Sequence, residues 1–119
     1  MRTILRQLKA LPGVRSAALV DLNWRCVVEL VGDAGGRAVT DEHGSRGSYV
    51  GARGGMMNAK EIVVTASSTF HIARPLVSRP DLVIHVALSR EHGLLTDTRM
   101  TMATLQELLD LQAAHGGAV

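Results

Sequence analysis

Cysteine is scarce in this sequence, since Cys26 is the only one among 119 residues. A single cysteine cannot build an internal disulfide framework, so the fold must depend on a hydrophobic core, and a reducing cytoplasm is the expected location. Apolar residues make up 46% of the chain, which is enough for one core at this length. We therefore expect residues 1–119 to form a single domain.

Long apolar runs are also missing. No segment approaches the roughly 20 consecutive apolar residues that a membrane-spanning helix needs. Arg2, Arg6 and Lys9 interrupt the N-terminal segment, where a secretory signal would carry an apolar stretch. We expect a soluble protein with no membrane span.

Charge of either sign is not concentrated anywhere. The formal net charge is only +2, and the 13 basic residues are spread along the chain. They form neither a basic tract nor a pattern interleaved with aromatic residues, as nucleic-acid-binding surfaces do. The sequence therefore predicts no nucleic-acid partner.

Motifs for catalysis or cofactor binding are absent as well. Gly51–Gly55 (GARGG) is rich in glycine, but neither GxxxxGK[ST] nor a strand-anchored GxGxxG follows. Ser67 and Ser68 lack the GxSxG setting of a nucleophilic serine, and turn chemistry explains them better. Cys26 lies in an apolar segment and is expected to be a small core residue rather than a nucleophile. We predict no enzyme activity and no cofactor.

The C-terminal half carries the clearest structural pattern. Strands are predicted at Glu61–Ala66, which is rich in Ile, Val and Thr, and at Thr69–Leu76, which alternates with a period of two, with a turn at Ser67 and Ser68. Arg74 and Pro75 mark the end of the second strand, because proline cannot donate to the sheet. After a turn at Ser78–Asp81, Leu82–Leu88 is apolar on both faces and predicts a strand that is covered on both faces.

Helices are predicted at both ends of the chain. Residues 2–11 have apolar side chains on one face, and Pro12-Gly13 ends that helix. Beyond Gly93 the side chains that recur at helical spacing are Met102, Leu105, Leu108, Leu109 and Gln112. Between the first helix and the middle of the chain, Val14–Leu22 and Cys26–Val31 form a hairpin that turns at Asn23 and Trp24.

The middle of the chain, residues 33–60, is rich in glycine, with seven glycines and few apolar anchors. Each glycine inside a helix costs about 0.5 to 1 kcal/mol relative to alanine. We expect partial order or elevated mobility in this variable segment.

Two histidines fall on adjacent predicted strands. A turn at Ser78–Asp81 places His71 and His85 nearly opposite each other on one face. Two imidazoles without a third His, Cys or carboxylate make a poor metal site, so we expect buried or interface histidines and no metal.

The order of elements resembles the Roadblock / dynein light chain family. The resemblance is carried by LPGVRSAALVD at residues 11–21, by EIVVTASSTFHIARPLVSRPDLVIHVALSRE at residues 61–91, and by LLTDTR at residues 94–99. It implies a profilin-like α-β-β-α-β-β-β-α fold with a five-stranded antiparallel sheet. The terminal helices would cover one face and the glycine-rich segment the other.

This resemblance also implies a function. Relatives are homodimers that bind and regulate small Ras-like GTPases in bacterial signalling, some of them encoded beside a sensor kinase. Their third strands pair across the dimer, so the expected interface here is Glu61, Ile62, Val63, Val64 and Thr65. An unpaired apolar edge would favour aggregation unless covered; the alternative is an ordinary inner strand.

A GTPase would contact the surface from Gly35 to Met57 and the neighbouring second strand. Trp24 is expected either to cap the core or to be an exposed contact anchor, since Trp and Arg are frequent at binding hot spots. The candidate contact residues are Trp24, Arg25, Tyr49, Arg53, Met56 and Met57. Two alternatives stay open: a small-ligand sensor with a pocket beneath residues 33–60, and a purely structural dimer module.

Overall fold

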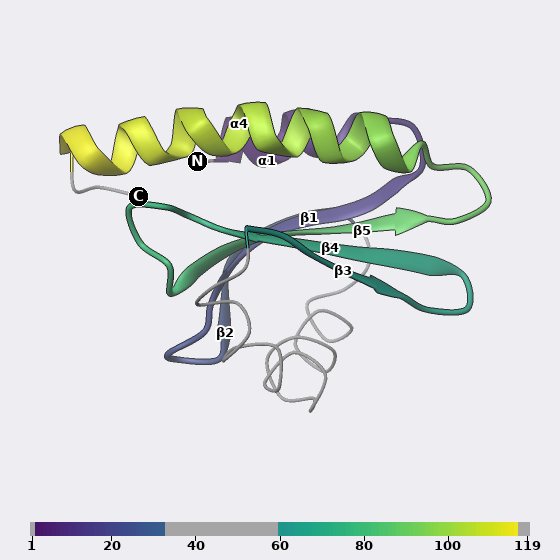
Figure 1. Cartoon of the computed structure of the whole chain (residues 1–119), viewed down its shortest axis with the longest axis horizontal. Helices are drawn as coiled ribbons and strands as arrows, with labels where there is room; N and C mark the ends of the chain where they lie inside the picture. The colour runs from purple at the N-terminus through teal and green to yellow at the C-terminus, as the bar shows by residue number, and fades with distance from the viewer. Residues whose placement is uncertain (1, 33–59, 117–119) are drawn as a thin grey trace.

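The computed structural model describes residues 2–32 and 60–116, with side chains up to residue 112 (Figure 1). The elements of this part are α1 (Arg2–Lys9), β1 (Val14–Asp21), β2 (Cys26–Gly32), β3 (Ile62–Thr65), β4 (Thr69–Pro75), β5 (Leu82–Ser89) and α4 (Leu95–Gly116). Each begins and ends within a few residues of the predicted bounds. Residues 33–59, and with them the expected middle helix, lie outside the description.

All five strands belong to one antiparallel sheet, in the order β2-β1-β5-β4-β3. β5 lies at the centre and is buried along its whole length, because it has a neighbouring strand on each side and apolar contacts on both faces. β3 lies at one edge, so the alternative of an inner strand for this segment is wrong. β2 forms the other edge.

The two terminal helices cover one face of the sheet, as predicted (Figure 1). α1 buries Ile4, Leu5 and Leu8, whose spacing places them on one side of the helix. α4 contributes Met102, Leu105 and Leu109 to the same core, together with inward residues of β1, β4 and β5. A hydrophobic core between helices and sheet thus fixes where α4 lies relative to β4.

The opposite face of the sheet carries a second apolar cluster. Ala18, Val20 and Val83 belong to it, while their chain neighbours Ala17, Leu19 and Ile84 belong to the core under the helices. This division follows from the alternation of side chains along a strand. It explains why the run Ala17–Val20 in β1 and most positions of β5 are apolar on both faces.

The turn after α1 packs closely against the loop before α4. Gly13 has a φ of 78°, and a Cβ at this position would lie 2.5 Å from the Cα of Gly93. Glycine satisfies both requirements, since it adopts positive φ without strain and has no side chain. The backbone N–H of Ser89 donates to the Gly13 carbonyl at 2.8 Å, which joins this turn to the end of β5.

Candidate interface edge

The outer edge of β3 has backbone hydrogen-bonding groups that pair with no other strand of the described residues. Ala66 N–H donates to the Thr69 carbonyl at 2.9 Å, and the register then pairs Val64 with His71 and Val63 with Ile72. In an antiparallel pair, every second residue of a strand directs its backbone N–H and C=O groups toward the partner strand, and the residues between them direct theirs away from it. Val64 therefore bonds to β4, while the N–H and C=O groups of Val63 and Thr65 point outward.

The two edges of the sheet differ in regularity. The pairing of β1 with β2 shifts register between Leu19 and Val20, and Val28, which the register leaves unpaired, is exposed. A bulge of this kind twists an edge and disfavours further strand addition. β3 pairs with β4 in an unbroken register, and its Val63 is 36% exposed. Of the two edges, β3 is the one better suited to accept another strand.

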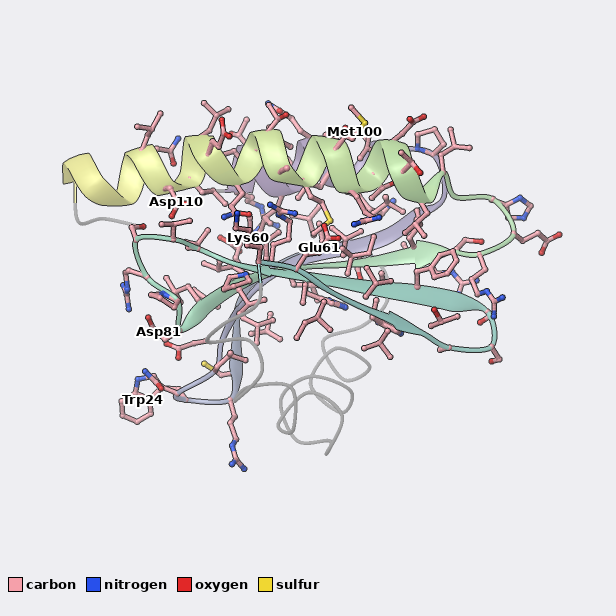
Figure 2. All side chains as sticks on the ribbon, in the orientation of Figure 1. Trp24, Lys60, Glu61, Asp81, Met100 and Asp110 are labelled. Carbon is pink, nitrogen blue, oxygen red and sulfur yellow. The ribbon has the colours of Figure 1, made fainter. Side chains whose placement is uncertain are left out.

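Glu61 anchors the beginning of β3 to the rest of the domain. Its Oε2 accepts a hydrogen bond from Arg74 Nη1 at 2.8 Å, and its Oε1 accepts one from Arg99 Nε at 2.6 Å. Only 11% of the Glu61 side chain is exposed, so its carboxylate faces into its own domain (Figure 2). Glu61 thus joins β3 to both β4 and α4.

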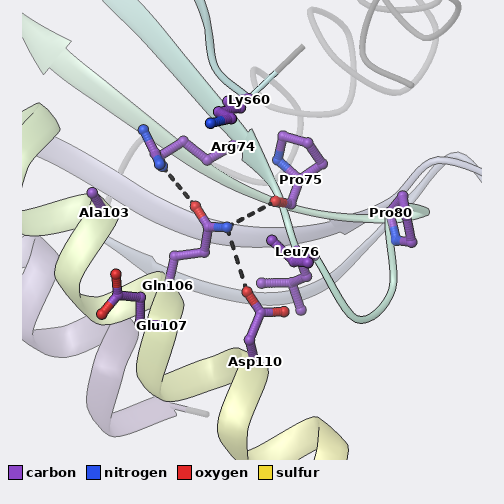
Figure 3. Close-up of a pocket in the computed structure, with 10 residues that line it drawn as sticks. Lys60, Arg74, Pro75, Leu76, Pro80, Ala103, Gln106, Glu107 and Asp110 are labelled. Atoms are coloured by element: carbon purple, nitrogen blue, oxygen red, sulfur yellow. Dashed lines mark hydrogen bonds between the residues drawn. The ribbon is translucent and has the colours of Figure 1, made fainter. Parts of the chain in front are cut away.

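Gln106 extends this network along α4. Its Oε1 accepts a hydrogen bond from Arg74 Nε at 2.6 Å, and its Nε2 donates to the Pro75 carbonyl at 3.1 Å (Figure 3). Nε2 also lies 3.4 Å from Asp110 Oδ2. From the sequence, Arg74 is recognisable only as the end of a strand. The network could not be predicted, because its members are far apart in the chain and follow no periodic pattern.

Asp110 connects α4 to the turn between β4 and β5. Its Oδ1 accepts hydrogen bonds from the backbone N–H of Ser78 at 2.9 Å and from the Ser78 hydroxyl at 2.8 Å. Partial burial by itself would raise the pKa of Asp110, but these hydrogen bonds outweigh it and lower the pKa below its usual value. Asp110 therefore carries a negative charge at neutral pH.

His71 and His85 lie on the same face of adjacent strands, as the sequence predicted, and the structure shows them in direct contact. Nδ1 of His71 lies 3.1 Å from Nε2 of His85, and the two rings are stacked within 10° of parallel. The register pairs His71 with Ala87 and His85 with Ala73, so the histidines are diagonal rather than directly opposite. Among the described residues no group of three potential metal ligands forms.

Trp24 lies at the tip of the β1–β2 hairpin and is 80% exposed (Figure 2). Asp21 Oδ1 accepts the backbone N–H groups of Asn23 and Trp24, and Arg25 adopts a φ of 51°. The turn is thus fixed locally. Trp24 does not cap the core, and its role as a contact anchor stays a prediction. Trp24 and β3 lie at opposite edges of the sheet, so among the described residues the candidate contacts Trp24 and Arg25 are not brought next to the expected interface strand.

Other candidate residues have different outcomes. The prediction that Cys26 is a core residue is wrong, because its side chain is exposed. Cys26 is the first residue of β2, directly after the turn, and among the described residues β2 has a neighbouring strand on one side only. The candidate contacts Tyr49, Arg53, Met56 and Met57 lie outside the described residues, as does any pocket beneath residues 33–59.

This arrangement of sheet and helices is that of a known fold. A Roadblock/LC7 domain from Streptomyces avermitilis superposes with a TM-score of 0.71 at 19% sequence identity, covering 92% of this chain and 93% of that domain. The chain has the Roadblock/LC7 fold. The same fold is found in MglC from Myxococcus xanthus, with a TM-score of 0.72, 12% identity and coverage of 93% of this chain and 97% of MglC.

A third Roadblock-fold structure is of MglB in a tetrameric arrangement. It has a TM-score of 0.71 and 12% identity, and covers 95% of this chain and 87% of MglB.

No family model matches the sequence, and no curated protein matches it. None of these similarities bears on the expected link to a sensor kinase, which stays a prediction. Among the described residues, neither helix combines the length and apolar character that crossing a membrane requires.

Proposed function

We propose that this chain is a bacterial member of the Roadblock family that acts as a non-enzymatic homodimeric scaffold in the cytoplasm, binding and regulating a small Ras-like GTPase. The observation that carries the proposal is the unbulged outer edge of β3, where Val63 and Thr65 direct their backbone groups outward. The fold adds support, because MglB, a protein with the same fold, is known in a tetrameric arrangement.

Pairing of two β3 strands explains the features of this edge. A twofold axis across the edge would place two antiparallel β3 strands side by side and satisfy the outward groups of both copies. The edge strand is short and apolar, so pairing also removes it from solvent and from unwanted partners. Glu61 fixes the start of the strand through Arg74 and Arg99, which keeps β3 ordered for pairing.

The GTPase contact is assigned to the surface from Gly35 to Met57, to β2 and to the hairpin tip. Trp24 and Arg25 belong to the residue types enriched at hot spots, and Trp24 is largely exposed on a turn that Asp21 holds in place. A preformed anchor loses little conformational freedom on binding. The GTPase itself supplies the nucleotide chemistry, and this chain supplies position and contact.

Binding and nucleotide hydrolysis test the proposal together. The Ras-like GTPase encoded nearest to this chain would be loaded with GDP or with a non-hydrolysable GTP analogue and titrated by biolayer interferometry. We expect binding that favours one nucleotide state, together with a changed rate of GTP hydrolysis. Trp24→Ala should weaken binding by roughly tenfold or more.

The matched control is Met100→Ala, since Met100 is 66% exposed but lies on α4, in the helical layer that covers one face of the sheet (Figure 2). It should bind as the wild type does. A dimeric, folded wild-type protein that binds neither nucleotide state would refute the GTPase assignment.

A further inference from the structure

A cavity of about 350 Å³ opens between α4 and the end of β4, on the face of the sheet that the helices cover (Figure 3). Its walls are α4, the last residues of β4 and the β4–β5 turn, with Lys60 at one side. It is therefore distinct from the β3 edge and from the hairpin tip. Its volume is within the range of small-molecule sites.

One side of this cavity is positively charged. Lys60 is exposed there, and Arg74 lines the wall beside it. The hydrogen bonds of Arg74 to Glu61 and Gln106 use two of its five N–H bonds. Glu61 also pairs with Arg99, so the charges of Arg74, Arg99 and Glu61 together give one net positive charge. Together with Lys60, this side is suited to a carboxylate.

The opposite side is negatively charged. Glu107 and Asp110 are three residues apart on α4 and both line the cavity, as side chains at this spacing lie on one face of a helix. Asp110 is held in place by Ser78, and Glu107 is exposed. Gln106 lies between the two charged sides, and its amide is oriented by Arg74 and Pro75 (Figure 3).

Apolar side chains complete the cavity. Pro75 and Pro80 contribute rigid rings, and the largely exposed Val77 lies next to a second recess that it shares with Leu111. Apolar surface beside two opposite charged sides requires a ligand with three matching parts: a negative end, a positive end and an apolar group. A ligand with only a negative charge would be repelled by Glu107, and a ligand with only a positive charge would be repelled by Lys60.

We propose that this cavity binds a small zwitterion with an apolar side chain, a free amino acid or a dipeptide. Its carboxylate lies against Lys60 and Arg74, its ammonium group against Glu107 and Asp110, and its side chain against Pro75, Val77 and Pro80. Charge-assisted hydrogen bonds of this kind are stronger than neutral ones. This ligand site goes beyond the proposed GTPase scaffold and does not depend on it.

Calorimetric titration of the full chain tests the site directly. The twenty amino acids and L-leucyl-L-leucine would be screened first by thermal shift at 5 mM, and L-leucine then titrated. For a ligand of this size we expect a dissociation constant on the order of 0.01 to 1 mM. 4-Methylpentanoate and 3-methylbutylamine, which each keep one charge, should bind at least about tenfold more weakly.

Variants of the two charged sides make the test specific. Lys60→Met and Glu107→Gln should each weaken L-leucine binding by roughly tenfold. Lys9→Met on α1 and Glu91→Gln in the exposed loop before α4 make the same chemical changes elsewhere and should leave binding unchanged. Unfolding temperature confirms that each variant is folded.

Three outcomes would each overturn the proposal. The first is that no compound in the panel shifts the melting temperature or gives heat of binding. The second is that L-leucine binding survives both charge removals, and the third is that the singly charged analogues bind as tightly as L-leucine. GTPase binding is measured in a separate experiment. If the cavity binds no zwitterion, the proposed GTPase scaffold is unaffected, and if no GTPase binds, the proposal for the cavity is unaffected.

Discussion

Glu61 and Arg99 are joined by a hydrogen bond of 2.6 Å between Oε1 and Nε, although 38 residues separate them in the chain. This contact holds the first residue before β3 against α4. With the 2.8 Å bond from Arg74 on the other carboxylate oxygen, it makes Glu61 the link between the proposed dimer edge and the helical layer.

Replacing Glu61 should loosen the start of β3. Glu61→Gln keeps the shape but removes the charge that faces two arginines, so we expect the free energy of unfolding to fall by about 1–3 kcal/mol. Urea denaturation measures the change. Glu91→Gln, at an exposed loop position, is the control and should change stability little. Equal stabilities of the two variants would contradict the anchoring role of Glu61.

Gln106 should be needed for the stability of the contact between α4 and β4. Gln106→Met preserves volume but leaves Arg74 Nε without its acceptor and the Pro75 carbonyl without its donor. Unsatisfied polar groups of this kind cost about 1–3 kcal/mol. Gln112→Met, an exposed position on the same helix, is the matched control in urea unfolding. If both variants unfold at the same urea concentration, the Gln106 amide contributes nothing.

Asp110 should contribute stability that depends on pH in a defined direction. Because the folded-state pKa lies below the unfolded value of about 3.9, its contribution is fully present above the unfolded pKa. It is lost as pH falls through the folded pKa. Asp110→Asn should therefore be less stable than the wild type at pH 7, and the difference should shrink below about pH 4.

Urea unfolding at several pH values between 7 and 3 checks this dependence. Ser78→Ala, which removes one of the donors to Asp110, should show the same trend with a smaller amplitude. A stability difference between wild type and Asp110→Asn that is constant over this range would contradict the assignment.

The strands were predictable because their signals are local. Alternation in Thr69–Leu76 and the turn at Ser78–Asp81 depend on neighbouring residues, and the observed β4 and β5 follow them closely. The His71–His85 contact was predictable for the same reason, since one short turn connects their strands. The order of the predicted elements resembled the Roadblock family, and that resemblance implied the five-stranded antiparallel sheet that the described residues form.

The missed features depend on where elements lie in space. Cys26 looked like a core residue because its neighbours are apolar, but the position of β2 at the sheet edge leaves it exposed. The partners of Arg74 come from the start of β3 and from α4, and no local pattern connects Glu61 with Gln106. The charged cavity has the same origin, because α4 supplies its negative side and the β3–β4 region its positive side.

The molar mass in solution tests the central claim, dimerisation through the outer edge of β3. We would measure it by light scattering after size exclusion for the wild type and for Val63→Pro, which removes an outward N–H and no β3–β4 hydrogen bond. Thr65→Pro is a second variant of the same kind. Circular dichroism verifies that both are folded.

Dimerisation through β3 predicts a wild-type mass of about twice 12.7 kDa at micromolar concentrations, and folded variants close to the monomer mass. A wild type that stays monomeric at every concentration would contradict the claim. So would folded Val63→Pro and Thr65→Pro proteins that both remain dimers.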